Sequence, residues 1–102
     1  MSPDVVQHQA ELEQLCRAFH VRRLELFGSA ATGHDHPGES DFDFLVEFEP
    51  MPPGAYATAY FRLLQALEAL FDRPIDLVAP EAIANPYLRQ SIDETKVLIF
   101  AA

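Results

Sequence analysis

The chain has 102 residues, of which 49% are hydrophobic and 23% charged, proportions that are ordinary for one folded domain. Sixteen acidic residues against seven basic ones give a formal net charge of −9. This balance argues against a broad nucleic-acid surface, which needs clustered lysine and arginine. The single cysteine, Cys16, excludes an intrachain disulfide and a thiolate zinc cluster.

The first part of the sequence predicts a helix followed by a strand. A helical pattern opens at Pro3, and its apolar stripe consists of Leu12, Leu15, Cys16 and Phe19. Residues 21–27, VRRLELF, alternate between apolar and charged side chains, which predicts a half-buried strand. Its apolar side carries Leu24 and Leu26, and its charged side Arg23 and Glu25.

A glycine ends this strand and a second strand follows after a polar loop. Gly28 is followed by SAATG, which can form a short helical turn, and residues 33–40 form a turn rich in glycine and proline. Residues 41–48, DFDFLVEF, alternate again. They predict a strand with phenylalanines on one side and the carboxylates of Asp41 and Asp43 on the other.

The second half predicts two more helices and two more strands. After a break at residues 50–54, a long amphipathic helix runs to Phe71, and residues 74–80, PIDLVAP, predict a short strand. A helix from about Asn85 to Asp93 follows, with Asn85 as its cap and Pro86 as its first residue. Residues 96–100, KVLIF, predict the last strand.

This order of elements predicts an α/β (α+β) fold, with a small mixed sheet and helices packed mainly on one face. The apolar side chains of three strands would lie on the helix-covered face: Leu24, Leu26, Phe42, Phe44, Ile75 and Leu77. Asp41, Asp43 and Asp76 would then share the opposite face. Three carboxylates from two strands can therefore converge on one cleft.

The three aspartates suit a site for divalent metal ions. Carboxylates that crowd together in a low dielectric repel one another, and a cation removes that repulsion. Mg²⁺ prefers hard oxygen ligands and is often bound by one or two carboxylates together with substrate phosphates. Asp41 and Asp43 have the spacing to share one ion or bridge two, and Asp76 can hold a second ion or accept the proton of an attacking hydroxyl. Taken alone, however, an aspartate pair at a strand start is also typical of an exposed turn.

The glycine–serine step adds a phosphate-binding feature to this site. Backbone N–H groups at the start of a helical turn attract anions, and a glycine lets a phosphate approach the backbone closely. The hydroxyl of Ser29 would add one more donor. A phosphate cradle at Gly28 and Ser29, one loop before a metal-binding pair, points to phosphoryl-type chemistry more strongly than either feature alone.

These segments resemble the nucleotidyltransferase superfamily that includes DNA polymerase β. The resemblance rests on FGSAATG, SDFDFLV and IDLV, and it extends from about Val21 to Val78. The family pattern is Gly-Ser, a loop of around ten residues, Asp-x-Asp, and a third carboxylate on a later strand; here eleven residues separate Ser29 from Asp41. The small size is similar to that of the minimal nucleotidyltransferases, in which residues 1–102 would form one catalytic domain.

The resemblance implies an Mg²⁺-dependent enzyme that uses a nucleoside triphosphate, commonly ATP. Gly28 and Ser29 would hold the triphosphate, and Asp41, Asp43 and Asp76 would be the catalytic and metal-binding carboxylates. Many minimal members are the antitoxin half of a pair with a HEPN-domain ribonuclease toxin, and family members are described as transferring AMP to a tyrosine of that toxin. The resemblance therefore implies a cognate HEPN-domain toxin as partner. No direct nucleic-acid or membrane partner is expected. The sequence has neither an apolar run of about 20 residues nor a signal peptide, so a cytoplasmic location is expected, and homo-oligomerisation is open.

One position departs from the family pattern. Many relatives read Gly-Ser-x-Ala-Arg-Gly, whereas this chain has Thr32 where the arginine would stand. The missing positive charge predicts weaker triphosphate binding unless another base substitutes, and Arg23 and Arg73 are the candidates.

Two alternative functions remain open from the sequence. The chain can be an antitoxin that neutralises its toxin by binding alone, in which case loss of the aspartates would leave protection intact. It can also be a nucleotidyltransferase for a small hydroxyl compound, although such enzymes generally carry a second domain that holds the acceptor.

Overall fold

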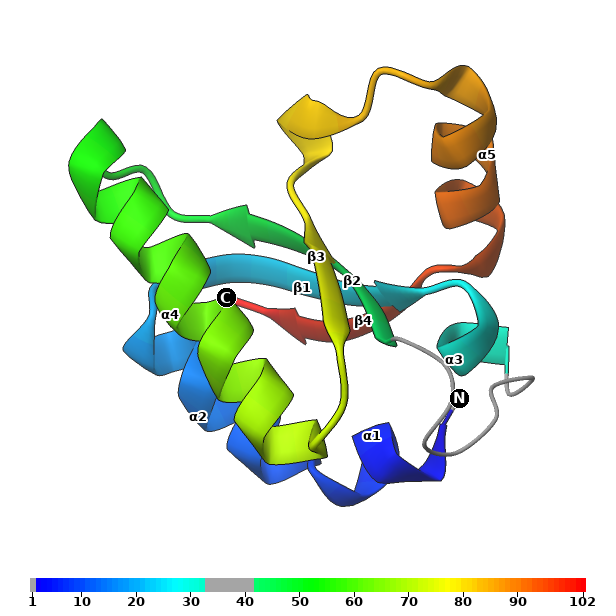
Figure 1. Ribbon diagram of the computed structural model, residues 1–102, viewed down its shortest axis with the longest axis horizontal. Coiled ribbons are helices and arrows are strands. Elements are labelled where there is room, and N and C mark those ends of the chain that lie inside the picture. Colours follow the sequence, from blue (N-terminus) through cyan, green and yellow to red (C-terminus); the bar gives the residue numbers. More distant parts are fainter. Residues whose placement is uncertain (1, 33–41) are drawn as a thin grey trace.

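The computed structural model describes residues 2–32 and 42–102 and shows a four-stranded mixed sheet in the order β3-β2-β1-β4 (Figure 1). The strands are β1 (Val21–Phe27), β2 (Phe42–Phe48), β3 (Ile75–Val78) and β4 (Val97–Ala101). Strand β1 pairs antiparallel with β2 and β4, and β2 pairs parallel with β3. The predicted small mixed sheet is therefore confirmed.

The helices are α1 (Pro3–Gln7), α2 (Gln9–Ala18), α3 (Ser29–Thr32), α4 (Pro53–Phe71) and α5 (Pro86–Thr95), with a 3-10 turn at Pro80–Ala82. The single helix predicted from Pro3 is divided at His8, whose ring nitrogen Nδ1 lies 2.8 Å from the carbonyl oxygen of Asp4. The predicted cap of α5 is present, because the side chain of Asn85 accepts a hydrogen bond from Tyr87 N–H. Among the described residues, no helix combines the length and apolarity needed to cross a membrane.

One face of the sheet is covered by α1, α2 and α4 (Figure 1). The core between these helices and the sheet contains the alternating apolar residues of the strands, as the sequence predicted. Phe42 and Phe44 are fully buried, and the ring of Phe42 packs edge-on against Phe71 of α4 with 4.9 Å between centroids. Burying side chains of this size stabilises the fold by about 1.5–3 kcal/mol each, so the orientation of β2 is strongly fixed.

The other face of the sheet is partly covered by α5, which lies across the sheet from α2 and α4 (Figure 1). Ile92 of α5 and Phe27 of β1 are both buried, yet neither belongs to the main core. The prediction of a half-buried β1 is wrong for Glu25, which is only 6% exposed. Because β1 is a central strand, Glu25 has neighbours on both sides, and its Oε1 lies 3.2 Å from Nε of Arg23.

Candidate functional site

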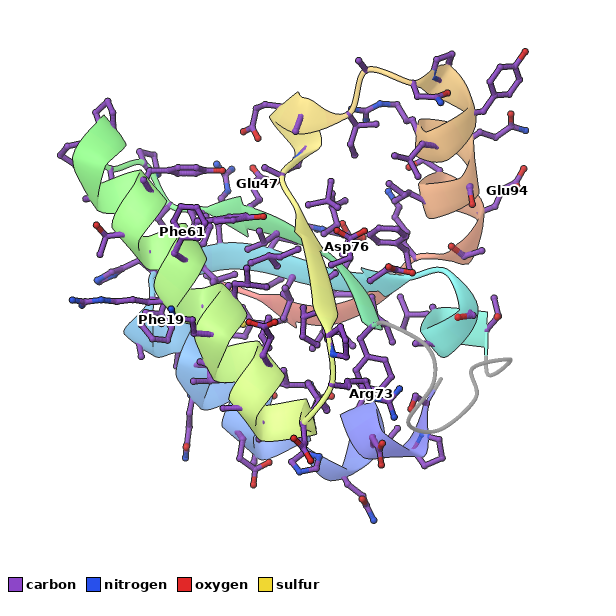
Figure 2. All side chains as sticks on the ribbon, viewed as in Figure 1. Phe19, Glu47, Phe61, Arg73, Asp76 and Glu94 are labelled. Carbon is purple, nitrogen blue, oxygen red and sulfur yellow. The ribbon has the colours of Figure 1, made fainter. Side chains whose placement is uncertain are left out.

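The face of the sheet opposite α4 presents two of the predicted carboxylates side by side. Asp43 and Asp76 are direct register partners in the parallel pair β2–β3, and neighbouring strands lie about 4.8 Å apart. Their apolar neighbours explain the orientation, because Phe42, Phe44 and Leu77 are buried in the main core and side chains alternate along a strand. Figure 2 shows Asp76 on the side of β3 that faces α5. Asp43 is half-buried and Asp76 is exposed.

Gly28 brings the glycine–serine step against the same carboxylate pair. Phe27 pairs with Asp43 across β1 and β2, so Gly28 follows directly beside it. Gly28 has a φ of 74°, a left-handed conformation that only glycine adopts without strain. A Cβ added to Gly28 would lie 2.6 Å from Oδ2 of Asp43. The missing side chain is therefore what allows the carboxylate of Asp43 to lie against the backbone of this turn.

The turn after Gly28 forms the short helix α3. The N–H groups of Ala31 and Thr32 both donate to the carbonyl of Gly28, at 3.2 and 3.3 Å. The hydroxyl of Thr32 donates to the carbonyl of Ser29 at 3.1 Å. Beneath the turn, the N–H of Ser2 donates to the carbonyl of Ala30 at 2.8 Å, so the beginning of the chain supports α3. The threonine that replaces the usual arginine is exposed and closes this turn.

The structure thus brings together Gly28, Ser29, Asp43 and Asp76 at one end of the sheet. Asp41, the remaining predicted ligand, lies outside the described residues, as does the predicted polar turn at 33–40. Within residues 2–32 and 42–102, no three histidine, cysteine, aspartate or glutamate side chains cluster as a metal site. The described part nevertheless fits Mg²⁺, because two hard oxygen donors are adjacent in register and Gly28 leaves the space that one of them occupies.

Neither arginine named as a substitute for the missing one lies in the turn itself. Arg23, on β1, is five residues before Gly28, about 16 Å away at the usual rise per residue, and its guanidinium pairs with Glu25. The guanidinium of Arg73 lies 3.9 Å from the ring centroid of Phe42 and 3.2 Å from Oδ2 of Asp4. Its side chain is only 6% exposed, and Figure 2 shows it beside α1.

Two residues outside the predicted site contact its turn and the strand that carries Asp76. The N–H of Gly28 donates to Oγ1 of Thr95, the last residue of α5, at 3.0 Å. The hydroxyl of Tyr60, on α4, donates to the carbonyl of Leu77, the residue after Asp76. Burial, and then the negative charge of Asp76, raise the pKa of Tyr60 above its usual value. Neither contact has a local signal, since each joins positions far apart in the sequence.

Comparison with known proteins identifies the family of this chain. Residues 10–99 match the family model of the nucleotidyltransferase domain. This chain belongs to the nucleotidyltransferase domain family. The match includes both the Gly28 turn and the strands that carry Asp43 and Asp76, so the carboxylate pair belongs to the shared domain rather than to an appended segment.

The relatives of this nucleotidyltransferase domain include protein adenylyltransferases. It is 33% identical to a provisionally named protein adenylyltransferase, MJ1379 of Methanocaldococcus jannaschii, over 79% of each chain. It is also 33% identical to protein adenylyltransferase MntA of Thermococcus cleftensis, over 81% of this chain and 84% of the relative. The resemblance to minimal nucleotidyltransferases predicted from the sequence is thereby confirmed.

Solved structures agree with this nucleotidyltransferase fold. A structure provisionally named a minimal nucleotidyltransferase is 30% identical, with a TM-score of 0.74 over 95% of each chain. A second match is a chain of the complex between a tri-AMPylated HEPN toxin of Shewanella oneidensis and its MNT antitoxin, with a TM-score of 0.65. It is 20% identical and covers 96% of this chain and 73% of that one, so it supports the fold alone.

Proposed function

We propose that this chain is an antitoxin that transfers AMP from ATP to a hydroxyl group, a tyrosine hydroxyl, of a cognate HEPN-domain toxin and so neutralises it. The observation that carries the proposal is the register pair of Asp43 and Asp76 beside the Gly28 turn. Relatives at 33% identity are named protein adenylyltransferases. A structure with the same fold holds an AMPylated HEPN toxin with its antitoxin.

The proposed reaction is an in-line displacement at the α-phosphorus of ATP. The acceptor oxygen forms a bond to the α-phosphorus, the bond to the oxygen that bridges to the β-phosphate breaks, and pyrophosphate leaves. The proton of the acceptor hydroxyl passes to a carboxylate, for which the exposed Asp76 is the candidate. Gly28 and Ser29 would hold the triphosphate. Asp41, Asp43 and Asp76 would hold Mg²⁺, which when bound supplies neutralisation of the charge that develops on the phosphate oxygens.

A groove on the α4 side of β3, the strand that carries Asp76, favours a protein as the acceptor. It has a volume of about 710 Å³ and runs between α4 and the edge strand β3, where Leu77 and Val78 directly follow Asp76. Phe61, on its wall, is 59% exposed. A large exposed aromatic side chain beside an apolar groove is typical of a surface that binds another protein. A small polar acceptor would gain little from such a lining.

Label transfer tests the proposal directly. The protein would be incubated with α-labelled ATP, Mg²⁺ and the toxin encoded beside it, and label on the toxin would be measured. We expect transfer by the native chain and none by Asp43→Asn or Asp76→Asn. Asp93→Asn is the matched control, because Asp93, on α5, forms an exposed ion pair with Lys96. Absence of transfer by the native chain, or equal transfer by the Asp43 variant, would refute the proposal.

The same variants distinguish catalysis from neutralisation by binding. Cells that produce the toxin would be protected by the native chain and by Asp93→Asn. A folded Asp43→Asn or Asp76→Asn variant that still binds the toxin should fail to protect them. Full protection by such a variant would favour the antitoxin that acts by binding alone.

A further inference from the structure

The backbone N–H of Gly28 donates a hydrogen bond to a side chain from near the C-terminal end of the chain. It donates to Oγ1 of Thr95 at 3.0 Å, a contact that spans 67 residues of sequence. The hydroxyl of Thr95 in turn donates its proton to the carbonyl of Ser91 at 2.8 Å. Because a hydroxyl has one proton and that proton is committed to Ser91, its lone pair is free to accept from Gly28. Both bonds are satisfied at once.

The elements on both sides of Thr95 in the chain fix its position. Ile92, one turn earlier on α5, is only 2% exposed, and its carbonyl accepts from the N–H of Lys96. Strand β4 begins at Val97 and pairs with β1, the strand that directly precedes Gly28. Thr95 is therefore held between a buried anchor and a strand of the sheet. A hydroxyl placed in this way can fix the position of a turn.

Gly28 is also the residue that touches both halves of the candidate site. Its Cα lies so close to Asp43 that a Cβ added to it would be 2.6 Å from Oδ2 of that residue. Its carbonyl accepts the hydrogen bonds that close the turn containing Ser29. A shift of Gly28 would therefore move the wall behind Asp43 and the start of α3 together.

We propose that Thr95 is a positioning residue for triphosphate binding: its hydroxyl holds the Gly28–Ser29 turn in the conformation that receives the phosphates. Because Thr95 accepts from the N–H of Gly28, this N–H is not a phosphate donor, and Gly28 contributes to the site through the shape of the turn. Thr95 itself touches neither nucleotide nor acceptor. The nucleotide part of this inference rests on the proposed function.

The test uses variants that separate the hydroxyl from the methyl group of Thr95. Thr95→Val removes the hydroxyl, and Thr95→Ser retains it. Thr58→Val is the matched control, because the hydroxyl of Thr58 donates to Gly54, four residues earlier on α4, as that of Thr95 donates to Ser91. The control therefore loses the same bond within a helix but no bond to the turn. Thr95→Ala replaces the valine variant if the valine does not fold.

Two measurements are made on each folded protein. Hydrogen exchange of the Gly28 amide, followed by NMR in the protein without ligand, reports the bond to Thr95 directly. Calorimetric titration with ATP and Mg²⁺ reports the effect on nucleotide binding. For Thr95→Val we expect faster exchange at Gly28 and a dissociation constant for ATP raised by roughly 2- to 10-fold, the range that the loss of one hydrogen bond produces. Thr95→Ser and Thr58→Val should both resemble the native chain.

Each contrary outcome has a definite meaning. Unchanged exchange at Gly28 in Thr95→Val, or unchanged ATP binding in that variant, overturns the inference. Equal losses in Thr95→Ser and Thr95→Val also overturn it, because the hydroxyl would then be irrelevant. A native chain that binds ATP but labels no toxin refutes the proposed function and leaves this inference standing.

Discussion

Replacing Gly28 by alanine should damage the site through two separable effects. The first concerns the backbone, because a φ of 74° costs a residue with a side chain about 1–2 kcal/mol. For a domain of this size, that cost lowers the melting temperature by about 5–15 °C. The second concerns the carboxylate of Asp43, whose Oδ2 would lie 2.6 Å from the new Cβ. It must retreat by roughly 0.8 Å to reach the 3.4 Å at which ordinary van der Waals contact begins.

The two effects should appear in different measurements. The carboxylate is the end of a side chain and can rotate away at little cost in stability, but a catalytic group displaced by about 1 Å can lose up to about 10²-fold in rate. We therefore expect Gly28→Ala to lower kcat/KM for label transfer by roughly 10- to 100-fold. Thermal unfolding followed by circular dichroism would show the backbone cost alone.

Two companion variants test this reasoning. Gly54→Ala is the control, because a Cβ added to Gly54 meets nothing within 4 Å and alanine at such a site is neutral or stabilising by up to about 1 kcal/mol. In an Asp43→Ala background, Gly28→Ala should cost only the backbone strain, since the nearest remaining atom, the Cβ of residue 43, lies 3.8 Å away. A Gly28→Ala protein with the activity and melting temperature of Gly54→Ala would refute the argument.

Two further predictions concern residues on either side of the site. The pKa of Tyr60 is raised above 10.0 by burial and by Asp76, so the native state keeps its phenolic proton when the unfolded state has lost it. Stability should therefore fall as the pH rises above about 10, and urea unfolding at several pH values should show a smaller fall for Tyr60→Phe. Asn85→Ala removes the cap of α5 and should cost about 0.5–2 kcal/mol in the same assay, whereas Asn85→Asp should restore it.

Much of the fold could be predicted because its signals are local. The alternation of residues 42–48 indicates one buried face, and the structure buries Phe42 and Phe44 as expected. The buried Glu25 could not be predicted in this way. Alternation describes which way a side chain points, but its exposure depends also on the strands beside it, and β4, which pairs with β1 at Glu25, comes from far along the chain. The helix end predicted at about Asp93 lies two residues before the observed end at Thr95, where the N–H of Lys96 still donates to the carbonyl of Ile92.

In the candidate site, too, features set within one strand could be predicted, and features set by contacts between distant segments could not. The alternation of each strand predicts that Asp43 and Asp76 lie on one face, and the parallel register makes them neighbours. The sequence gives no reason to choose that register, since pairing two strands depends on what connects and covers them. Tyr60 illustrates the converse: it occupies an apolar stripe of α4, and only the tertiary contact with Leu77 distinguishes it from the leucines around it.

The structure gives Gly28 a different role from the one that the sequence predicts. A glycine before a short helical turn leaves room for a phosphate, and on this ground the sequence predicts that Gly28 binds the nucleotide. In the structure the carboxylate of Asp43 fills the space where a Cβ of residue 28 would lie. The N–H of Gly28 donates to the hydroxyl of Thr95. Glycine is therefore required here even before a nucleotide binds, because any side chain would push away a carboxylate of the proposed metal site. If so, substitutions at Gly28 should weaken Mg²⁺-dependent steps at least as strongly as they weaken the binding of ATP.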